Sequence, residues 1–391
     1  MKIGIVSTGI FKKEKVGGFE KIALDTALAL KEKNIDVCII CPSDYGFGAY
    51  MMFHPKIGEI PIYTFRRARR FSDLISAYKG LKRLKQILDL DIIHHQAVST
   101  YLPFILNVFD EAKHIVTFQD PRDFKDMIIE RTFAEQIQPM LFSPFFPMYI
   151  IIKNKTLGFY LKKVDIYTAQ AKFLVNKAMR LFNLSKKPIY IPNFVQVPKR
   201  KIKKSETPKV CFLGRLDKRK RPEIFIGLAK YFPDVEFIMI GRAHDIRRDR
   251  KIKLLAKKRP NIKVMGFVSE EKKNKILEEC WILINTAARE ALPVSFLEAL
   301  AHKTAILSCN NPDNLTSNYG YYVQMSLSER LVLYDVKIVK KFANALKLML
   351  EEDIWKVKGE KGYDFCKKHY DKELVIKKYI RLYKYLLYES C

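Results

Sequence analysis

The sequence contains no hydrophobic run long enough to cross a bilayer as a helix. Its longest apolar stretch, PMLFSPFFPMYIII at residues 139–152, has 14 residues and three prolines, whereas a spanning helix needs about 20 apolar residues and is broken by proline. The N-terminal MKIGIVSTGI has no signal-peptide cleavage pattern and is typical of a first core strand. We therefore do not expect an integral membrane protein.

Glycine, proline and cysteine are also scarce. With 16 Gly and 17 Pro in 391 residues, the chain is too poor in both to be fibrous or disordered, and its 48% apolar content can fill the two cores that this length requires. The seven cysteines are odd in number and scattered, which favours a reducing compartment. Cys38 and Cys41 share a strand-like run at a spacing that points them to opposite faces, which argues against a zinc or redox pair.

Acidic residues are too few to balance the basic ones. The 71 Lys and Arg exceed the 42 Asp and Glu by 29, and the excess is shared between residues 1–200, at +13, and residues 201–391, at +16. Such a charge implies a polyanionic partner, an anionic membrane or a phosphorylated substrate. A non-catalytic nucleic-acid-binding protein is the competing class, although no helix-turn-helix, RRM or zinc-finger pattern is present. A thermophilic host would also enrich Lys, Arg and Glu.

Short Val/Ile-rich runs alternate with amphipathic stretches along the whole chain. Buried strands that alternate with helices predict an α/β fold with parallel sheets. A polar, basic segment without apolar period lies between Asn193 and Lys209 and is typical of a linker. We predict two Rossmann-like doubly wound domains that face each other across a cleft: residues 1–195, a linker at 196–208, and residues 209–370. The last residues, 371–391, form an amphipathic helix that we expect to pack back on the N-terminal domain.

Candidate binding residues follow the predicted strands of the second domain, where ligands of open parallel sheets bind. The run KVCFLGRL is followed by Arg215 and Lys220, which could neutralise a diphosphate. The start of the helix near Pro293 offers free amides to a phosphate. Glu290 and Glu298 flank that start and could accept hydrogen bonds from sugar and ribose hydroxyls. A solvated basic loop and a solvated helix residue are the alternatives.

Gly17 and Gly18 lie between the first predicted strand and its helix. Glycines at this position permit close approach of the backbone to an anion. A plain turn is equally compatible with them, because the sequence here is neither GxGxxG nor a P-loop.

Taken in order, these pieces resemble the retaining glycosyltransferases of the GT-B fold, family 4, also called glycosyl transferases group 1. The resemblance covers nearly the whole chain. Its motifs are the Gly-Gly-x-Glu loop, TFQDP, VDIYTAQ…PIYIPN, GRLDKRK, IGRA, GFV, and the Glu-x7-Glu pair of Glu290 and Glu298. A single Glu-x7-Glu pair is common by chance, whereas all of these motifs at the right element boundaries are a specific match.

The resemblance implies roles for individual residues. Glu290, Lys220 and Arg215 would be catalytic, with the two cations on the donor diphosphate, Glu290 on the transferred sugar and Glu298 on the ribose. The rest of the donor site would be Val268 near the base and the backbone of Leu292, Pro293, Val294 and Ser295. A loop for acceptor and phosphate would contain Gly17, Gly18, Glu20, Gln119 and Asp120. The family generally uses no bound metal and no cofactor besides the nucleotide-diphosphate sugar.

Three positions depart from the family pattern. Gln119 replaces a frequent His, Arg221 replaces the Gly after the lysine, and Phe194 replaces the Gly after Asn193. No imidazole can titrate at position 119, although an amide can still bind a sugar hydroxyl. The other two changes affect the shape of the donor pocket.

A basic, apolar stripe at residues 66–88 suggests contact with a membrane. Eight of its apolar residues fall on one helical face among arginines and lysines, which is typical of a helix that lies on anionic lipid: Phe71, Leu74, Ile75, Tyr78, Leu81, Leu84, Ile87 and Leu88. The alternative is that this stripe packs on the sheet. We thus expect a cytoplasmic enzyme at the inner face of the membrane that transfers a sugar to a glycan or lipid-linked acceptor. A nucleotide-sugar epimerase of the same fold is a further alternative.

Overall fold

The computed structural model describes residues 1–9, 18–54, 58–134 and 145–388. The chain forms two compact units. The first comprises Met1–Pro121, Met148–Asn193 and Lys372–Cys391, and the second comprises Arg122–Pro147 and Phe194–Asp371. The C-terminal helix therefore belongs to the first unit. The segment Arg122–Pro147, which lies within the predicted N-terminal domain of residues 1–195, belongs to the second unit.

The first unit is built on a sheet of eight strands among its described residues, in the order β3-β4-β2-β1-β5-β6-β7-β8. All neighbouring strands run parallel except the β3–β4 pair. Burial of the Val/Ile-rich runs explains their strand formation, because every residue of β1 after Lys2 and of β5 is buried. The strands are β1 (Lys2–Val6), β2 (Asp36–Ser43), β3 (Gly48–His54), β4 (Gly58–Arg66), β5 (Ile92–His95), β6 (Lys113–Phe118), β7 (Ile166–Ala169) and β8 (Ile189–Tyr190).

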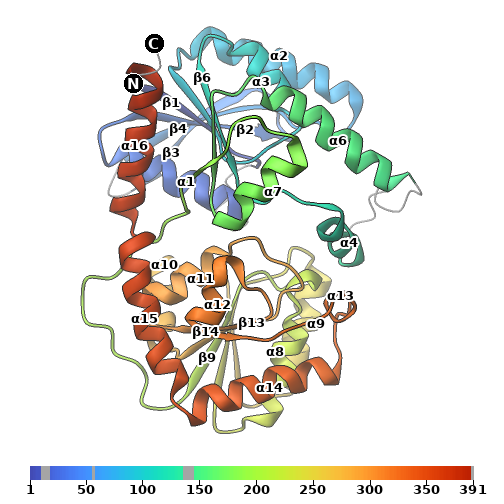
Figure 1. Cartoon of the computed structure of the whole chain (residues 1–391), viewed down its shortest axis with the longest axis vertical. Coiled ribbons are helices and arrows are strands. Elements are labelled where there is room, and N and C mark those ends of the chain that lie inside the picture. Colours follow the sequence, from blue (N-terminus) through green and yellow to red (C-terminus); the bar gives the residue numbers. More distant parts are fainter. Residues whose placement is uncertain (10–17, 55–57, 135–144, 389–391) are drawn as a thin grey trace. The chain divides into compact units, whose positions relative to one another are not determined.

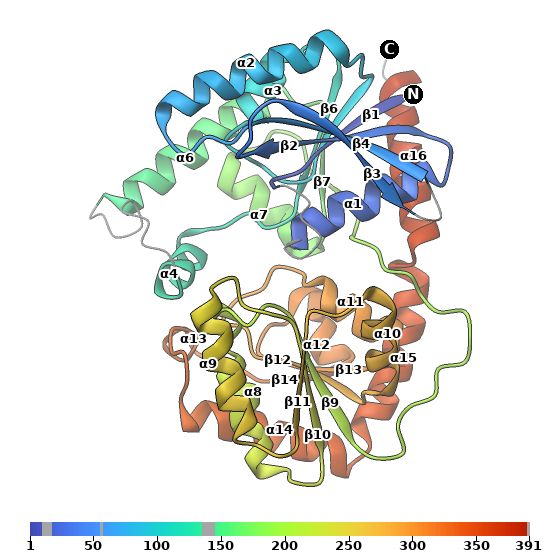
Figure 2. The same cartoon turned by 180° about the vertical axis from the view of Figure 1, so that it is seen from behind.

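Helices cover both faces of this sheet (Figures 1 and 2). On one face, Leu81 and Leu84 of α2 and Ile105 of α3 pack with Ile40 and Phe65 of the strands. On the other face α1 contacts α16, and Tyr383 of α16 reaches His94 of β5. The helices of this part are α1 (Gly18–Lys31), α2 (Phe71–Ile87), α3 (Leu102–Val108), α6 (Phe146–Leu161), α7 (Lys172–Phe182) and α16 (Lys372–Tyr388).

The second unit contains a parallel sheet of six strands among its described residues, in the order β11-β10-β9-β12-β13-β14. Its core joins α8, α9 and α14 to one face of the sheet, while α10, α11 and α15 lie on the other (Figure 2). The strands are β9 (Lys209–Leu213), β10 (Glu236–Ile240), β11 (Ile262–Gly266), β12 (Ile282–Asn285), β13 (Ala305–Ser308) and β14 (Gly320–Tyr322). The helices are α4 (Phe124–Thr132), α8 (Pro222–Leu228), α9 (Ile246–Lys257), α10 (Glu270–Glu279), α11 (Val294–Ala301), α12 (Leu315–Asn318), α13 (Leu327–Arg330), α14 (Val336–Glu351) and α15 (Ile354–His369).

Two doubly wound α/β units confirm the predicted fold class. The apolar stripe of residues 66–88 does not form a membrane-facing surface, because Leu81, Leu84 and Leu88 are buried in the core of the first unit. Only Ile75 and Ile87 of the apolar stripe are largely exposed among its described side chains. The stripe therefore packs on the sheet, which was the alternative reading. None of the helices in the described residues is long and apolar enough to cross a membrane.

Candidate active site

The loop that follows β9 carries the predicted cations of the second unit. Gly241, at the end of β10, allows this loop to approach closely: a Cβ at Gly241, whose φ is +134°, would lie 1.9 Å from the carbonyl oxygen of Gly214. Arg215 then projects with 42% of its side chain exposed, and its Nε lies 3.1 Å from Asp217 Oδ2. Arg215 also contacts His244. Its guanidinium is thus held in place and still open to solvent.

Arg221 explains one departure from the family pattern. It adopts the left-handed conformation, with φ +49° and ψ +52°, that glycine adopts most easily. Its guanidinium is fully buried and donates to the carbonyl oxygens of Thr286, at 2.7 Å, and Glu329, at 3.0 Å. Thr286 in turn donates to the carbonyl of Lys220 at 2.8 Å. The arginine therefore offsets the cost of its strained backbone by tying the Lys220 loop to the end of β12.

Lys220 and Glu290 form a buried ion pair at the carboxyl ends of β9 and β12. The Lys220 ammonium contacts Glu290 Oε1, and the two side chains are only 16% and 7% exposed. Asn285 Nδ2, at the end of β12, donates to the same Glu290 oxygen at 3.1 Å. The Glu290 amide donates to Asn310 Oδ1 at 3.1 Å. Two of the three residues predicted as catalytic are therefore in direct contact, and the third, Arg215, lies on the same loop as Lys220.

The charges around this pair favour an ionised carboxylate. Burial alone would raise the pKa of Glu290, but the Lys220 ammonium and the Arg219 guanidinium outweigh it and hold that pKa below its ordinary value. Burial lowers the pKa of Lys220, and the cations of Arg219 and Arg215 lower it further against the opposing effect of Glu290. An anion that entered beside Lys220 would relieve this crowding of positive charge.

Glu298 lies in the second turn of α11 and is held by a lysine that the sequence did not single out. Lys273 Nζ of α10 lies 2.5 Å from Glu298 Oε1, and the two side chains are 9% and 12% exposed. Lys273 also contacts Glu270. The run SEEKKNK contains three lysines, and nothing in the sequence indicates that Lys273 is the one that is buried. Only the packing of α10 on α11 selects it.

The start of α11 brings four more predicted donor residues together. Pro293 is the N-cap of this helix, with φ −71° and ψ +131°, one position earlier than the first-turn place we expected. Its carbonyl accepts from the Phe296 amide at 3.0 Å. Leu292 is buried, whereas Val294 and Ser295 are half-buried and lie in the first turn. Val268 is half-buried after β11, beside Phe267, which is exposed.

The short helix α4 is fastened to this part of the second unit by ion pairs. Arg289 Nε lies 2.6 Å from Asp126 Oδ1, and Arg219 lies 3.2 Å from Glu130 Oε1. Ile129 of α4 packs against Ala288. Because Arg289 and Arg219 directly precede Glu290 and Lys220 in the chain, α4 buttresses both residues of the central ion pair.

Four of the five predicted residues of the first unit lie in the described part of the chain, in separate segments. Gly17 lies outside the described residues, and Gly18 begins α1. Glu20 accepts a hydrogen bond from Thr8 Oγ1 at 3.3 Å. Asp120 is half-buried after β6. Gln119, the residue before it, directly follows β6 and is buried, with 1% of its surface exposed.

Gln119 is part of a buried cluster of four amides. Its Nε2 lies 3.2 Å from Gln96 Oε1 and from Asn193 Oδ1, and its Oε1 accepts from Asn193 Nδ2 at 3.1 Å. Gln170 donates to the Gln119 carbonyl. These residues follow β5, β6 and β7 and the chain beyond β8, so the cluster ties together the carboxyl ends of the strands. The Gln119 side chain is occupied by its neighbours rather than open to a ligand.

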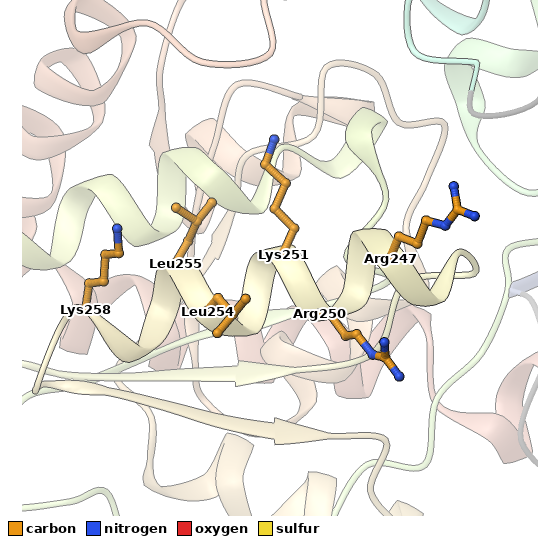
Figure 3. A pocket seen from close by; sticks show the side chains of 6 residues that line it. All are labelled: Arg247, Arg250, Lys251, Leu254, Leu255 and Lys258. Carbon is orange, nitrogen blue, oxygen red and sulfur yellow. The ribbon is translucent and has the colours of Figure 1, made fainter.

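No group of three His, Cys, Asp or Glu that could hold a metal ion occurs in the described part of the chain. A surface hollow of about 540 Å³ lies along α9 and is lined by Arg247, Arg250, Lys251, Leu254, Leu255 and Lys258 (Figure 3). None of these residues belongs to the predicted donor site. The hollow is therefore a separate cationic surface of the second unit.

Two protein families match this chain in sequence. Residues 196–361 match the family model Glycosyl transferases group 1, and residues 16–197 match Glycosyltransferase Family 4. No curated protein matches the sequence closely enough to be a relative.

Solved structures resemble the chain over its full length at low sequence identity. A sucrose-phosphate synthase from Thermosynechococcus elongatus is 15% identical, with 100% of both chains covered and a TM-score of 0.75. Anabaena HepE, solved in complex with UDP and glucose, is 12% identical, with coverage of 98% of this chain and 99% of its own and a TM-score of 0.68. The pneumococcal O-GlcNAc transferase GtfA, in complex with UDP and GlcNAc, is 10% identical, with 99% of both chains covered and a TM-score of 0.71. At these identities the likeness shows the fold.

Sequence reasoning predicts the residues of the candidate site but not the side chains that hold them in place. Lys273, Asn285, Asn310 and Gln96 carry no motif, and each becomes visible only through a contact with a residue far away in sequence. The two family matches together span residues 16–361, and the chain therefore belongs to the group 1 glycosyltransferases of the GT-B fold.

Proposed function

We propose that this glycosyltransferase moves a sugar from a UDP-sugar to a glycan or lipid-linked acceptor, with retention of the anomeric configuration and without a bound metal. The observation that carries the proposal is the buried ion pair of Lys220 and Glu290 at the carboxyl ends of β9 and β12. UDP is the first nucleotide to test because HepE and GtfA were solved in complexes that contain UDP.

The ion pair supplies both charges that a sugar diphosphate requires. A diphosphate bound beside Lys220 and Arg215 would take over the ammonium, because phosphate oxygens accept charge-assisted hydrogen bonds from Lys and Arg. The Glu290 carboxylate, which the surrounding cations keep ionised, would then accept hydrogen bonds from hydroxyls of the transferred sugar. Glu298, held by Lys273, would bind the ribose through its second oxygen.

Retention requires no additional nucleophile in this arrangement. If the acceptor attacks from the face that the diphosphate leaves, the bond from the anomeric carbon to the diphosphate breaks as the new glycosidic bond forms. The acceptor proton then passes to a leaving phosphate oxygen. Such a step depends on positioning and on stabilisation of the departing negative charge, which Lys220 and Arg215 would provide.

The acceptor would bind at the first unit, where Glu20 and the residues after β6 lie. The Gln119 side chain is engaged with Gln96 and Asn193, so its contribution would be to hold the strand ends rather than to move a proton. We also infer a cytoplasmic location, since the six cysteines in the described residues are buried and free.

The test is transfer by single variants. Lys220→Ala and Glu290→Ala should each lower the rate of sugar transfer by about 10²–10³-fold, the range for removal of one transition-state charge stabiliser. Lys251→Ala, which removes an exposed lysine of α9 in the same unit, is the matched control and should transfer normally. Near-normal transfer by both site variants would refute the proposal.

Two further readouts address the finer parts of the proposal. NMR of the product should show the donor's anomeric configuration, and EDTA should leave the rate unchanged. Nucleotide should be released only when an acceptor is present, whereas an epimerase would convert the donor without one.

A further inference from the structure

Helix α6 of the first unit has an apolar face that points to solvent. Most surface helices are apolar on one side only, and a helix that is apolar all round is usually buried or in contact with lipid. From Met148 onward, α6 is apolar on two opposite sides. The sheet can cover only one of them, so the other side needs a different partner to cover it.

The inner side of α6 is firmly packed in the first unit. Ile150, Leu157 and Leu161 are at most 8% exposed. Gly158 brings the helix against the end of α7, because a Cβ there would lie 2.3 Å from the carbonyl oxygen of Phe182. Tyr167 of β7 donates to the Leu161 carbonyl at 2.5 Å. The helix is therefore a fixed part of the unit, and its outer side is presented in a defined orientation.

The outer side of α6 carries large apolar side chains in water. Met148, Ile152 and Phe159, which follow one another at helical spacing, are 54%, 54% and 62% exposed. Ile151 and Tyr149 flank them and are 56% and 37% exposed. A cluster of this size on a surface helix usually marks an interaction site.

The charged side chains of α6 and of the two residues that follow it are all basic. Lys155, Lys162 and Lys163 are exposed, and α6 contains no acidic residue. The surrounding sequence extends the pattern, because Asp165 is the sole acidic residue between positions 136 and 205. Asp165 itself lies 3.6 Å from Lys113 Nζ and accepts from the His114 amide.

We propose that the outer side of α6, formed by Met148, Ile151, Ile152 and Phe159 with Lys155, Lys162 and Lys163, docks the enzyme on an anionic lipid surface. The helix would lie in the plane of the interface, with its apolar side chains below the headgroups and its lysines among the phosphates. A protein partner would need an acidic, apolar groove, whereas an anionic bilayer supplies both features over any length of helix. The proposal is independent of the sugar chemistry.

The test is sedimentation with vesicles in the absence of any sugar donor. The wild-type protein should bind vesicles of phosphatidylcholine and phosphatidylglycerol, and should bind vesicles of phosphatidylcholine alone much less. A variant with Met148→Ser, Ile152→Ser and Phe159→Ser should partition at least about tenfold more weakly, because each side chain buries apolar area in the interface. These positions are exposed, so circular dichroism should be unchanged.

Matched variants on α9 distinguish lipid binding through α6 from non-specific binding by exposed apolar or basic residues elsewhere. Ile246→Ser with Leu254→Ser removes side chains that are 66% and 62% exposed in the second unit and should leave vesicle binding unchanged. Lys155→Gln, Lys162→Gln and Lys163→Gln should weaken binding more than Arg247→Gln, Arg250→Gln and Lys251→Gln, which remove the same charge from the hollow in Figure 3. Equal losses in the two sets would overturn the proposal.

Other occupants of the surface have distinct signatures. If a second copy of the chain covers α6, ultracentrifugation will show a dimer that the triple serine variant dissociates, and vesicle binding will be absent. If an acidic protein does so, the wild type will again fail to bind vesicles at any anionic lipid content. Either result would refute lipid docking, whether or not the enzyme transfers sugar.

Discussion

Lys220 and Glu290 pair with each other in a largely buried place, and in our proposal the substrate diphosphate replaces Glu290 as the partner of the lysine. A buried charge is costly unless it is paired. Asn285, at the end of β12, fixes the Glu290 side chain, and Asn310, two residues after β13, fixes the Glu290 backbone. The polar groups that we propose to bind the substrate are therefore already oriented, which reduces the cost of ordering them on binding.

The low pKa of Lys220 predicts an alkaline limit on donor binding. Burial, with Arg219 and Arg215 nearby, lowers that pKa below the 10.5 of an ordinary lysine. If the protonated ammonium binds the diphosphate as proposed, affinity should be full below this pKa and should fall as the pH rises through it. Lys220→Arg keeps its charge and should lose this alkaline decline, as calorimetric titration with UDP at increasing pH would show. A decline of the same shape in both proteins would mean that another group titrates.

Lys273 should act on the donor through Glu298. Lys273→Met removes the ammonium that holds the Glu298 carboxylate, and we expect about tenfold weaker UDP binding, or ~1.4 kcal/mol. Because Glu298 is proposed to bind the ribose, discrimination between UDP and 2′-deoxy-UDP should also fall. Lys272→Met changes the exposed neighbour and is the control. Unchanged affinity and discrimination in Lys273→Met would separate Glu298 from ribose binding.

The sequence predicts the candidate substrate-binding residues more readily than the residues that support them. Arg215, Lys220, Glu290 and Glu298 stand out because charged residues follow apolar strands, where the fold places ligands. From the sequence, Arg221 is expected only to change the shape of the donor pocket. No local rule predicts that an arginine will adopt φ +49° and bury its guanidinium against distant carbonyls. Gln119 looked available to a hydroxyl, since its amide partners are 23 and 74 positions away.

At the scale of elements, β5 and β6 carry three buried histidines that secure the first unit. His94 lies 2.7 Å from both Tyr383 Oη of α16 and Thr117 Oγ1 of β6. His95 Nε2 lies 3.1 Å from His114 Nδ1. The strand–helix contact through His94 is one reason why the C-terminal helix belongs to the first unit.

These histidines predict acid sensitivity of the first unit. Burial lowers the pKa of His94 to about 3 and lowers those of His95 and His114. A folded pKa below the unfolded value of 6.5 means that the stability contribution is full above pH 6.5 and is lost as the pH falls towards 3. The loss is about 1.4 kcal/mol per pH unit for each neutral histidine.

The two units can be followed separately in that experiment. The chain has two tryptophans, and both Trp281 and Trp355 lie in the second unit, so their fluorescence reports on that unit alone. Urea unfolding at neutral and mildly acid pH should show a larger acid shift by circular dichroism than by tryptophan fluorescence. A first unit whose unfolding does not shift would contradict the role of the buried histidines.

Element prediction succeeded where the period was clear and failed where tertiary contacts decide. The parallel strands followed from their continuous Val/Ile runs. The β3–β4 pair was missed because its strands, Gly48–His54 and Gly58–Arg66, mix glycine, proline and aromatic residues and have no recognisable turn pair. The grouping of α4 with the second unit could not be foreseen, since Arg289 and Glu130 lie 159 positions apart.

For the whole molecule, the net charge of +29 has several sources. Part of it surrounds the candidate donor site, part lies on α9, and part flanks the apolar side of α6. Long-range attraction of an anionic donor is expected to weaken with salt, whereas the short contacts to Lys220 are screened less because they are buried.

The most direct test of the central claim, that the second unit holds a sugar-nucleotide diphosphate beside Lys220, is calorimetric titration of UDP into the wild type and into Lys220→Ala. We predict saturable binding at one site per chain, strongly weakened in Lys220→Ala and unchanged in the Lys251→Ala control. If no UDP binding is found, titrations with GDP, ADP and CDP should reveal the nucleotide that binds. Failure of all four to bind the wild type, or equal binding by Lys220→Ala, would contradict the account.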